Sequence, residues 1–110
     1  MKNLRNRVQL IGNLGNNPVL SETNNGIKYI KLSIATNSIY INKNGEKIKE
    51  TQWHPIVAWG KQAEFADKYI IKGQEVCIEG RLNYRNYEDS DGNKKNVFEI
   101  IANEILLLKK

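Results

Sequence analysis

The sequence predicts an all-β fold, and three observations lead to that expectation. Apolar and polar residues alternate with period two along most of the chain, in short runs bounded by Asn, Gly and Asp. Helical spacing occurs in one segment alone, residues 61–71. The length of 110 residues suits one compact domain, and no repeat or linker divides it. We therefore expect a single domain over residues 1–110.

The first two strands are expected over residues 8–14 and 27–36. Between them, the turn Asn16-Asn17-Pro18 stops the ladder because proline has no N–H to donate. One face of the second strand is apolar and should lie in the core: Ile30, Leu32 and Ile34. Its other face, which carries Lys31, should contact solvent.

Residues 37–50 predict a β-finger that stands off the body of the domain. Its tip, Asn44-Gly45, is the dipeptide favoured by a two-residue type I′ turn. The third strand then follows over residues 51–59. Because lysines flank the turn, the finger should be basic and exposed.

The helix over residues 61–71 precedes a fourth strand at 74–87 and a fifth at 96–108. The helix should bury one apolar stripe: Phe65, Ala66, Tyr69 and Ile70. Lys72-Gly73 supplies a cation and a glycine suited to its C-terminal end. Five strands with a helix between the third and fourth is the order of an OB-fold, a five-stranded Greek-key barrel, here with a protruding β-hairpin after the second strand.

The net charge of +5 and a pI of about 9.4 favour a polyanionic partner. Residues 1–49 hold eight Lys and Arg but two Asp and Glu. No segment reaches the ~18 apolar residues of a membrane span, so nucleic acid is favoured over membrane. On charge alone, an ordinary solubilising surface explains the excess equally well.

Cys77 is the single cysteine, which excludes an intrachain disulfide and a cysteine-based zinc site. The first residues lack the apolar core of a secretion signal. We therefore expect a cytoplasmic, nucleoid-associated protein without a cofactor.

The aromatic residues point to the candidate binding surface. Trp53 and Trp59 lie an even number of residues apart in one strand and so project from the same face. They form either a surface platform or a buried pair that fills the barrel, and parity leaves both open. Tyr40, at the base of the finger, and Tyr87, in the last hairpin, lie among polar residues, which favours a stacking surface.

Period two places Arg81 and Arg85 on the face of Tyr87. Bases stack on aromatic rings for ~1–3 kcal/mol each, and cations follow the phosphates. The pattern predicts sequence-independent binding of a nucleic-acid single strand. Tyr69 and Tyr84 are expected in the core by their spacing, and Tyr29 could lie on either side.

No catalytic constellation is visible. His54 is the single histidine, and no nucleophile or second acid–base group is placed beside it. Residues 12–15 lack the Lys-Ser/Thr end of a P-loop. The acids Glu88, Asp89 and Asp91 lack the spacing of a calcium loop. We expect neither an enzyme nor a metal site.

Four stretches occur in an order that resembles one family: VQLIGNLGNNP, IATNSIY, TQWHPIVAWGKQAEFADKYIIKGQEVCIEGRL and NYRNYEDSDG. Over residues 4–108 the chain is similar to the bacterial single-stranded DNA-binding proteins. The resemblance implies an OB-fold that usually assembles as a homotetramer. It also implies binding and protection of single-stranded DNA in replication, recombination and repair.

The resemblance places the family's stacking aromatics on Tyr40, Trp53, Trp59 and Tyr87. It places phosphate-contacting cations on Lys61, Lys72, Arg85 and the basic N-terminal strand around Arg5 and Arg7. Further charge comes from the finger: Lys43, Lys47 and Lys49. At Pro55 relatives often carry a basic residue, so one contact is expected to be lost.

The resemblance also implies that His54 lies at a subunit interface and that Cys77 occupies a neighbouring position. Family members usually continue into a flexible linker and an acidic tip that recruits other proteins. This sequence ends in Leu108-Lys109-Lys110, so recruitment through a tail is not expected. Two alternatives stay open: a dimeric RNA- or replication-restart-type OB module, and an enzyme acting on nucleic acid.

Overall fold

The structure is a computed structural model that describes residues 4–108, so the ends of the predicted domain, including Lys109 and Lys110, lie outside the described residues. The chain runs through six strands and one helix in the order β1 (Val8–Leu14), β2 (Ser21–Glu22), β3 (Lys28–Ile41), β4 (Lys47–Trp59), α1 (Lys61–Tyr69), β5 (Glu75–Glu88) and β6 (Lys94–Leu107).

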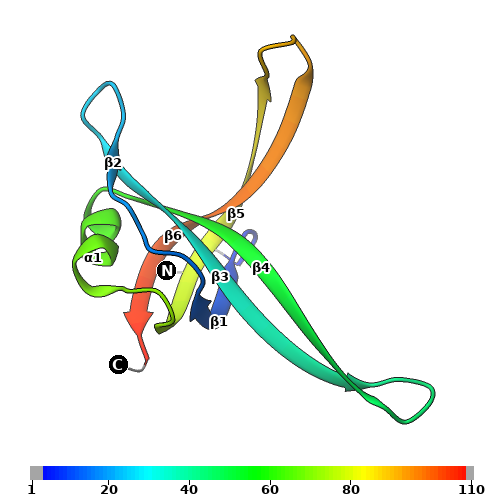
Figure 1. The fold of residues 1–110 in the computed structure, drawn as a ribbon. Coiled ribbons are helices and arrows are strands. Elements are labelled where there is room, and N and C mark those ends of the chain that lie inside the picture. Colours follow the sequence, from blue (N-terminus) through cyan, green and yellow to red (C-terminus); the bar gives the residue numbers. More distant parts are fainter. Residues whose placement is uncertain (1–3, 109–110) are drawn as a thin grey trace.

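The strands form one sheet in the order β1-β5-β6-β4-β3-β2, and a further pairing of β1 with β3 closes it into a barrel (Figure 1). Strands β4 and β6 pair in parallel, whereas the other pairings are antiparallel. The five long strands and the helix between β4 and β5 confirm the predicted fold class. The sequence did not predict β2, a two-residue strand on the edge of β3.

The barrel interior is filled by aliphatic side chains, as the period-two pattern predicted. Ile30, Leu32 and Ile34 of β3 are all buried, and they pack with Ile56 of β4 and Ile78 of β5. Burial of these side chains removes apolar surface from water, which stabilises the fold by about 25 cal/mol per Å² of buried apolar area. This is the main source of stability in a domain of this size.

The helix covers one end of the barrel through small residues. Ala63 and Ala66 of α1 and Ile70 just after it are buried, and Phe65 packs against the core. Three of the four predicted residues therefore face the barrel, and Ala63 joins them. Tyr69 was expected in the core, and that was wrong: it is 54% exposed and packs beside Phe65. Because two alanines bring α1 close to the barrel, only a narrow stripe of the helix is covered.

The predicted helix end at Lys72-Gly73 was also wrong. The helix ends at Tyr69, and Ile70 is already extended, with φ −106° and ψ 129°. Gly73 does adopt a positive φ of 91°, but in the turn that leads into β5. Ile70 is buried against the barrel in this extended conformation, so the chain has left the helix before it reaches the glycine.

The finger turn is not the predicted type I′ turn, which needs a positive φ at both central residues. Among residues 4–108 only glycines have positive φ, and Gly45, at 79°, is one of them. The loop is a three-residue one: the N–H of Gly45 donates to the carbonyl of Asn42, and the Asn42 side chain accepts from the N–H groups of Asn44 and Glu46.

The same loop recurs at the other two hairpins. The carbonyls of Thr23 and Asp89 accept from the N–H groups of Gly26 and Gly92, and their side-chain oxygens accept from the backbone beyond each glycine. The sequence signal is an oxygen-bearing side chain three residues before a glycine: TNNG, NKNG and DSDG. In each loop this side-chain oxygen accepts hydrogen bonds from backbone N–H groups, and these bonds favour a three-residue loop over a two-residue turn.

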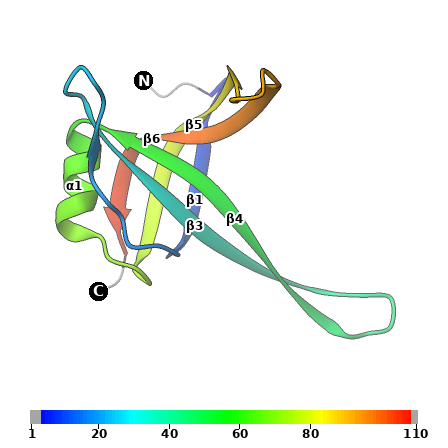
Figure 2. The ribbon, with the colours of Figure 1, turned by 45° about the horizontal axis from the view of Figure 1, so that its top comes forward.

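Two hairpin arms extend beyond the barrel, one formed by β3 and β4 and the other by β5 and β6 (Figures 1 and 2). The alternating pattern continues along both arms, but neither face of an arm is inside. Tyr84 was therefore wrongly expected in the core: it is 72% exposed and packs against Phe98 across the β5–β6 arm.

Candidate nucleic-acid interface

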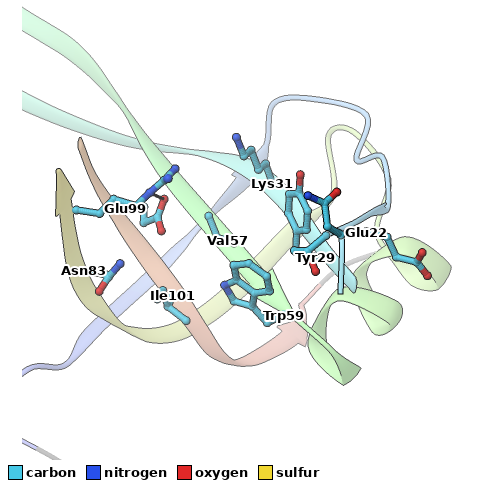
Figure 3. A pocket seen from close by; sticks show the side chains of 11 residues that line it. Glu22, Tyr29, Lys31, Val57, Trp59, Asn83, Glu99 and Ile101 are labelled. Carbon is cyan, nitrogen blue, oxygen red and sulfur yellow. Dashed lines mark hydrogen bonds and ion pairs between the residues drawn. The ribbon is translucent and has the colours of Figure 1, made fainter. Parts of the chain in front are cut away.

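A groove of about 590 Å³ crosses the outward faces of four strands (Figure 3). Its walls come from the β2–β3 hairpin and from β3, β4, β5 and β6: Glu22, Thr23, Asn24, Tyr29, Lys31, Val57, Trp59, Asn83, Arg85, Glu99 and Ile101. These residues are separated by up to 79 positions in the chain, from Glu22 to Ile101. Closure of the barrel brings them together.

One wall of the groove is aromatic. Tyr29 of β3 and Trp59 of β4 are directly opposite each other in the strand register. Their ring centroids lie 5.2 Å apart with an angle of 37° between the planes. Trp59 is 39% exposed, and Tyr29 is half-buried. Figure 3 shows both rings on one side of Val57, with Glu99 on the other. The sequence had left open whether Tyr29 belongs to the core or to the binding surface.

The opposite wall is charged. The Nε atom of Arg85 lies 3.4 Å from Oε1 of Glu99, and Glu99 is 7% exposed. Glu99 is the one buried charged side chain among residues 4–108. A buried carboxylate needs a positive partner, and Arg85 supplies it while half of its own side chain stays exposed. This arrangement fixes the guanidinium at the edge of the groove.

Sequence analysis did not single out Glu99. The signal that could have found it is a lone acid inside the apolar run VFEIIA of the last strand. On an outward position of a strand, such an acid is ordinary. It becomes informative only when the structure shows that it is buried beside an arginine.

The outward face of β5 extends the groove toward the hairpin arm. Arg81, Asn83, Arg85 and Tyr87 alternate onto this face, as the sequence predicted, and Asn83 and Arg85 line the groove. Arg81 and Tyr87 are both exposed. A cationic and aromatic strip therefore runs along β5 beside the Trp59 wall.

Trp53 lies on the same outward face of β4 as Trp59, three alternate positions away. It is 58% exposed, so the alternative in which the two tryptophans fill the barrel does not hold. The Trp53 ring lies directly over Gly15, where even a Cβ atom would overlap the indole. Pro55, between the two tryptophans in sequence, is exposed as well.

Tyr40 is exposed on the finger, but it faces the other way. In the β3–β4 register Tyr40 pairs with Ile48, whereas Trp53 pairs with Ala35. Their positions therefore alternate onto opposite faces of the β3–β4 ribbon. Figure 2 shows that this ribbon twists along the finger.

The lysines of the finger are all exposed. Lys47 and Lys49 lie opposite Ile41 and Ile39, on the same ribbon face as Trp53, and Lys43 lies in the loop. Both isoleucines are exposed too. The finger thus offers cations beside apolar surface.

The other predicted cations are dispersed. Lys61 is exposed at the start of α1, two residues after Trp59, and Lys72 is exposed in the loop after the helix. Arg5 lies before β1, outside any strand. Arg7 also precedes β1, and its Nε atom lies 2.6 Å from Oε2 of Glu79. That ion pair lines a different hollow from the groove.

The two predicted interface residues lie on or beside the barrel surface. His54 Nε2 and Thr36 Oγ1 are hydrogen-bonded at 2.8 Å. Cys77 is half-buried on β5, and its strand neighbours on either side, Ile11 and Leu106, are exposed. Sequence analysis did not single out these two apolar neighbours. Together, Ile11, Cys77 and Leu106 form an apolar patch that crosses three strands.

Within the described residues, 4–108, neither a metal-ligand cluster nor a membrane-spanning helix is present. No group of three or more His, Cys, Asp and Glu side chains there could hold a metal ion. No helix there is long and apolar enough to span a membrane.

Comparisons with known proteins agree on one family. The model of the "Single-strand binding protein family" matches residues 5–108. "Single-stranded DNA-binding protein 1" of Chlorobaculum tepidum is 40% identical over 104 residues, which is 94% of this chain and 64% of that protein. The single-stranded DNA-binding protein of Xanthomonas axonopodis pv. citri is 40% identical over 103 residues, which is 94% of this chain and 57% of that protein.

Solved structures agree as well. A structure described as "Plasmodium falciparum SSB complex with ssDNA" superposes with a TM-score of 0.85 at 31% identity, covering 99% of this chain and 98% of that one. A deletion mutant of the single-stranded DNA binding protein from Thermus aquaticus gives 0.83 at 33% identity, covering 94% of this chain and 50% of that one. The chain spans about three fifths of the length of the first curated relatives that it matches.

Proposed function

The chain belongs to the single-strand binding protein family, and on that premise we propose that it binds and protects single-stranded DNA without regard to sequence. The observation that carries the proposal is the outward face of β4, where two large indoles are exposed, one of them in a groove that Lys31 and Arg85 also line. Exposed aromatic area of this kind costs free energy in water unless a partner covers it.

The proposed mechanism separates stacking from charge. Bases stack on Trp53 and Trp59, and then on Tyr87 along the β5 arm and Tyr40 on the finger. Phosphates follow the cations beside these rings: Arg81, Arg85, Lys43, Lys47, Lys49 and Lys61. Since every base has a π-face and every nucleotide a phosphate, neither contact selects a sequence. No bond is made or broken in this proposal.

The setting that we propose is DNA replication, recombination and repair, in the cytoplasm on the nucleoid. The support is the family membership. Arg5, Arg7 and Lys72 lie away from the groove, so they contribute to binding only if the strand extends beyond it.

Titration of a labelled dT oligomer at two salt concentrations tests the proposal. With the six cations named above and a slope of roughly −0.7 per contact, affinity should fall on the order of 10⁴-fold between 50 and 500 mM salt. The tryptophan fluorescence should be quenched as the strand covers Trp53 and Trp59. A duplex of the same length is the control, and equal affinity for duplex and single strand would contradict the proposal.

We further propose that the chain assembles as a homotetramer. The support is the apolar patch of Ile11, Cys77 and Leu106, with His54 as a second predicted contact. Light scattering should give about four times the chain mass of 12.7 kDa. Leu106→Glu, which puts a charge into the patch, should lower that mass, whereas Leu4→Glu, at an exposed position before β1, should not. A dimer for the unchanged protein would favour the replication-restart alternative instead.

A further inference from the structure

Tyr29 lies where two hollows of the surface meet. The first is the groove that contains Trp59. The second, of about 310 Å³, is lined by Asn16, Asn17, Val19, Ser21, Tyr29 and Lys31. Tyr29 and Lys31 line both hollows, so the groove continues past Trp59, across the Tyr29 ring, to the loop between β1 and β2.

Hydrogen bonds between the Asn16 side chain and the backbone of β3 hold one wall of the second hollow in place. The Asn16 side chain accepts a hydrogen bond from the Ser33 N–H at 3.0 Å and donates one to the Lys31 carbonyl at 3.2 Å. These two bonds attach the loop to β3 on either side of Leu32. The hollow is therefore pre-formed, and a ligand entering it would not have to order the loop first.

The chemistry of the second hollow matches that of the first. It contains one aromatic ring, one exposed lysine two residues away on the same strand face, and exposed amide and aliphatic side chains at Asn17 and Val19. A ring and an adjacent cation are the two contacts that a nucleotide of a single strand needs.

Tyr29 does more than support Trp59. The 37° angle between the two rings leaves them tilted, not stacked face to face. One side of Tyr29 contacts Trp59, while the residue also lines the hollow beyond. A tyrosine that only supported the indole would have no need to line a second hollow beside a lysine.

We propose that Tyr29 is a further stacking residue, and that Tyr29 and Lys31 lead the single strand out of the Trp59 groove onto the segment 16–21. This inference rests on the proposed function, because it extends the same binding face. It adds a base contact and a phosphate contact that neither the sequence pattern nor the family resemblance had assigned.

The test compares Tyr29→Leu with a matched control, Tyr69→Leu, for binding of a labelled dT oligomer at one salt concentration. Tyr69, like Tyr29, lies beside another ring, but it is more exposed, lies on α1 and lines neither hollow. Tyr29→Leu should weaken binding on the order of tenfold. Tyr69→Leu should leave binding unchanged, and Tyr29→Phe, which keeps the ring, should retain most of it.

A double-mutant cycle distinguishes direct stacking from support of Trp59. If Tyr29 contacts a base itself, Tyr29→Leu should still weaken binding severalfold in a protein that already carries Trp59→Leu. If Tyr29 only positions the indole, the second substitution should have no further effect, and the inference is overturned.

Cross-linking of the unchanged protein gives a readout that does not depend on the variants folding. An oligomer of 5-iodouracil should photo-cross-link to Tyr29, identified by mass spectrometry of the digested complex. Absence of that cross-link, while the tryptophans do cross-link, overturns the inference and leaves the proposed function standing. Failure of the unchanged protein to bind dT overturns the proposed function and the inference with it.

Discussion

The double variant Trp53→Ala/Trp59→Ala should bind single-stranded DNA more weakly by about 2–6 kcal/mol, twice the ~1–3 kcal/mol expected for each base–aromatic stack. The two rings lie on the same outward face of β4 with two residue positions of that face between them, so their losses should be close to additive. Titration of a dT oligomer with each single variant and with the double variant measures both losses and their coupling.

The effect on folding should be small by comparison, because both indoles are partly exposed. Trp53→Phe/Trp59→Phe is the matched control, since it keeps two rings at the same places and should retain most of the affinity. Binding within twofold of the unchanged protein in the alanine double variant would show that the β4 face does not hold the strand.

Replacing Arg85 with methionine should affect both binding and stability, for different reasons. Binding loses one phosphate contact, so the slope of log affinity against log salt should become shallower by roughly 0.7. Folding loses the cation beside Glu99, which is 7% exposed. We expect a cost of about 1–2 kcal/mol in the free energy of unfolding, at the lower end for a buried charge because half of the Arg85 side chain is in water.

A second substitution separates the two effects. Arg85→Met/Glu99→Gln removes both charges, and it should restore most of the stability without restoring the salt slope. Urea unfolding at a fixed chain concentration, together with titrations at two salt concentrations, measures the two quantities. If the double variant is as unstable as Arg85→Met alone, the ion pair is not the source of the lost stability.

Within the barrel, the alternating pattern predicted the fold and the core correctly. Ile30, Leu32 and Ile34 are buried because β3 there has a packed interior on one side and solvent on the other. The same rule failed for Tyr84, where β5 has left the barrel and both faces are in water. Alternation indicates which residues share a face of a strand. Whether that face is buried depends on whether the strand is still part of the barrel at that point.

Local rules failed where packing or side-chain hydrogen bonds were stronger. The helix ends at Tyr69, and the next residue, Ile70, is extended and buried against the barrel, although a glycine follows later. The finger loop has the Asn-Gly pair of a two-residue turn, but hydrogen bonds to the Asn42 side chain favour a three-residue loop. In both cases the residue concerned lies outside the sequence motif: Ile70 precedes Lys72-Gly73, and Asn42 precedes Asn44-Gly45.

By itself, the sequence determined the closed all-β architecture, the shared outward face of Trp53 and Trp59, and the shared face of Arg85 and Tyr87, because these depend on residues close together in one strand. The tertiary structure decided that Tyr29, Trp59, Arg85 and Glu99 line one groove. Those residues come from four different strands, and the pairings that join them, among them the parallel contact of β4 with β6, form only when the sheet closes. Period two specifies the side of the strand on which a residue lies. Closure of the barrel specifies which residues of other strands lie beside it.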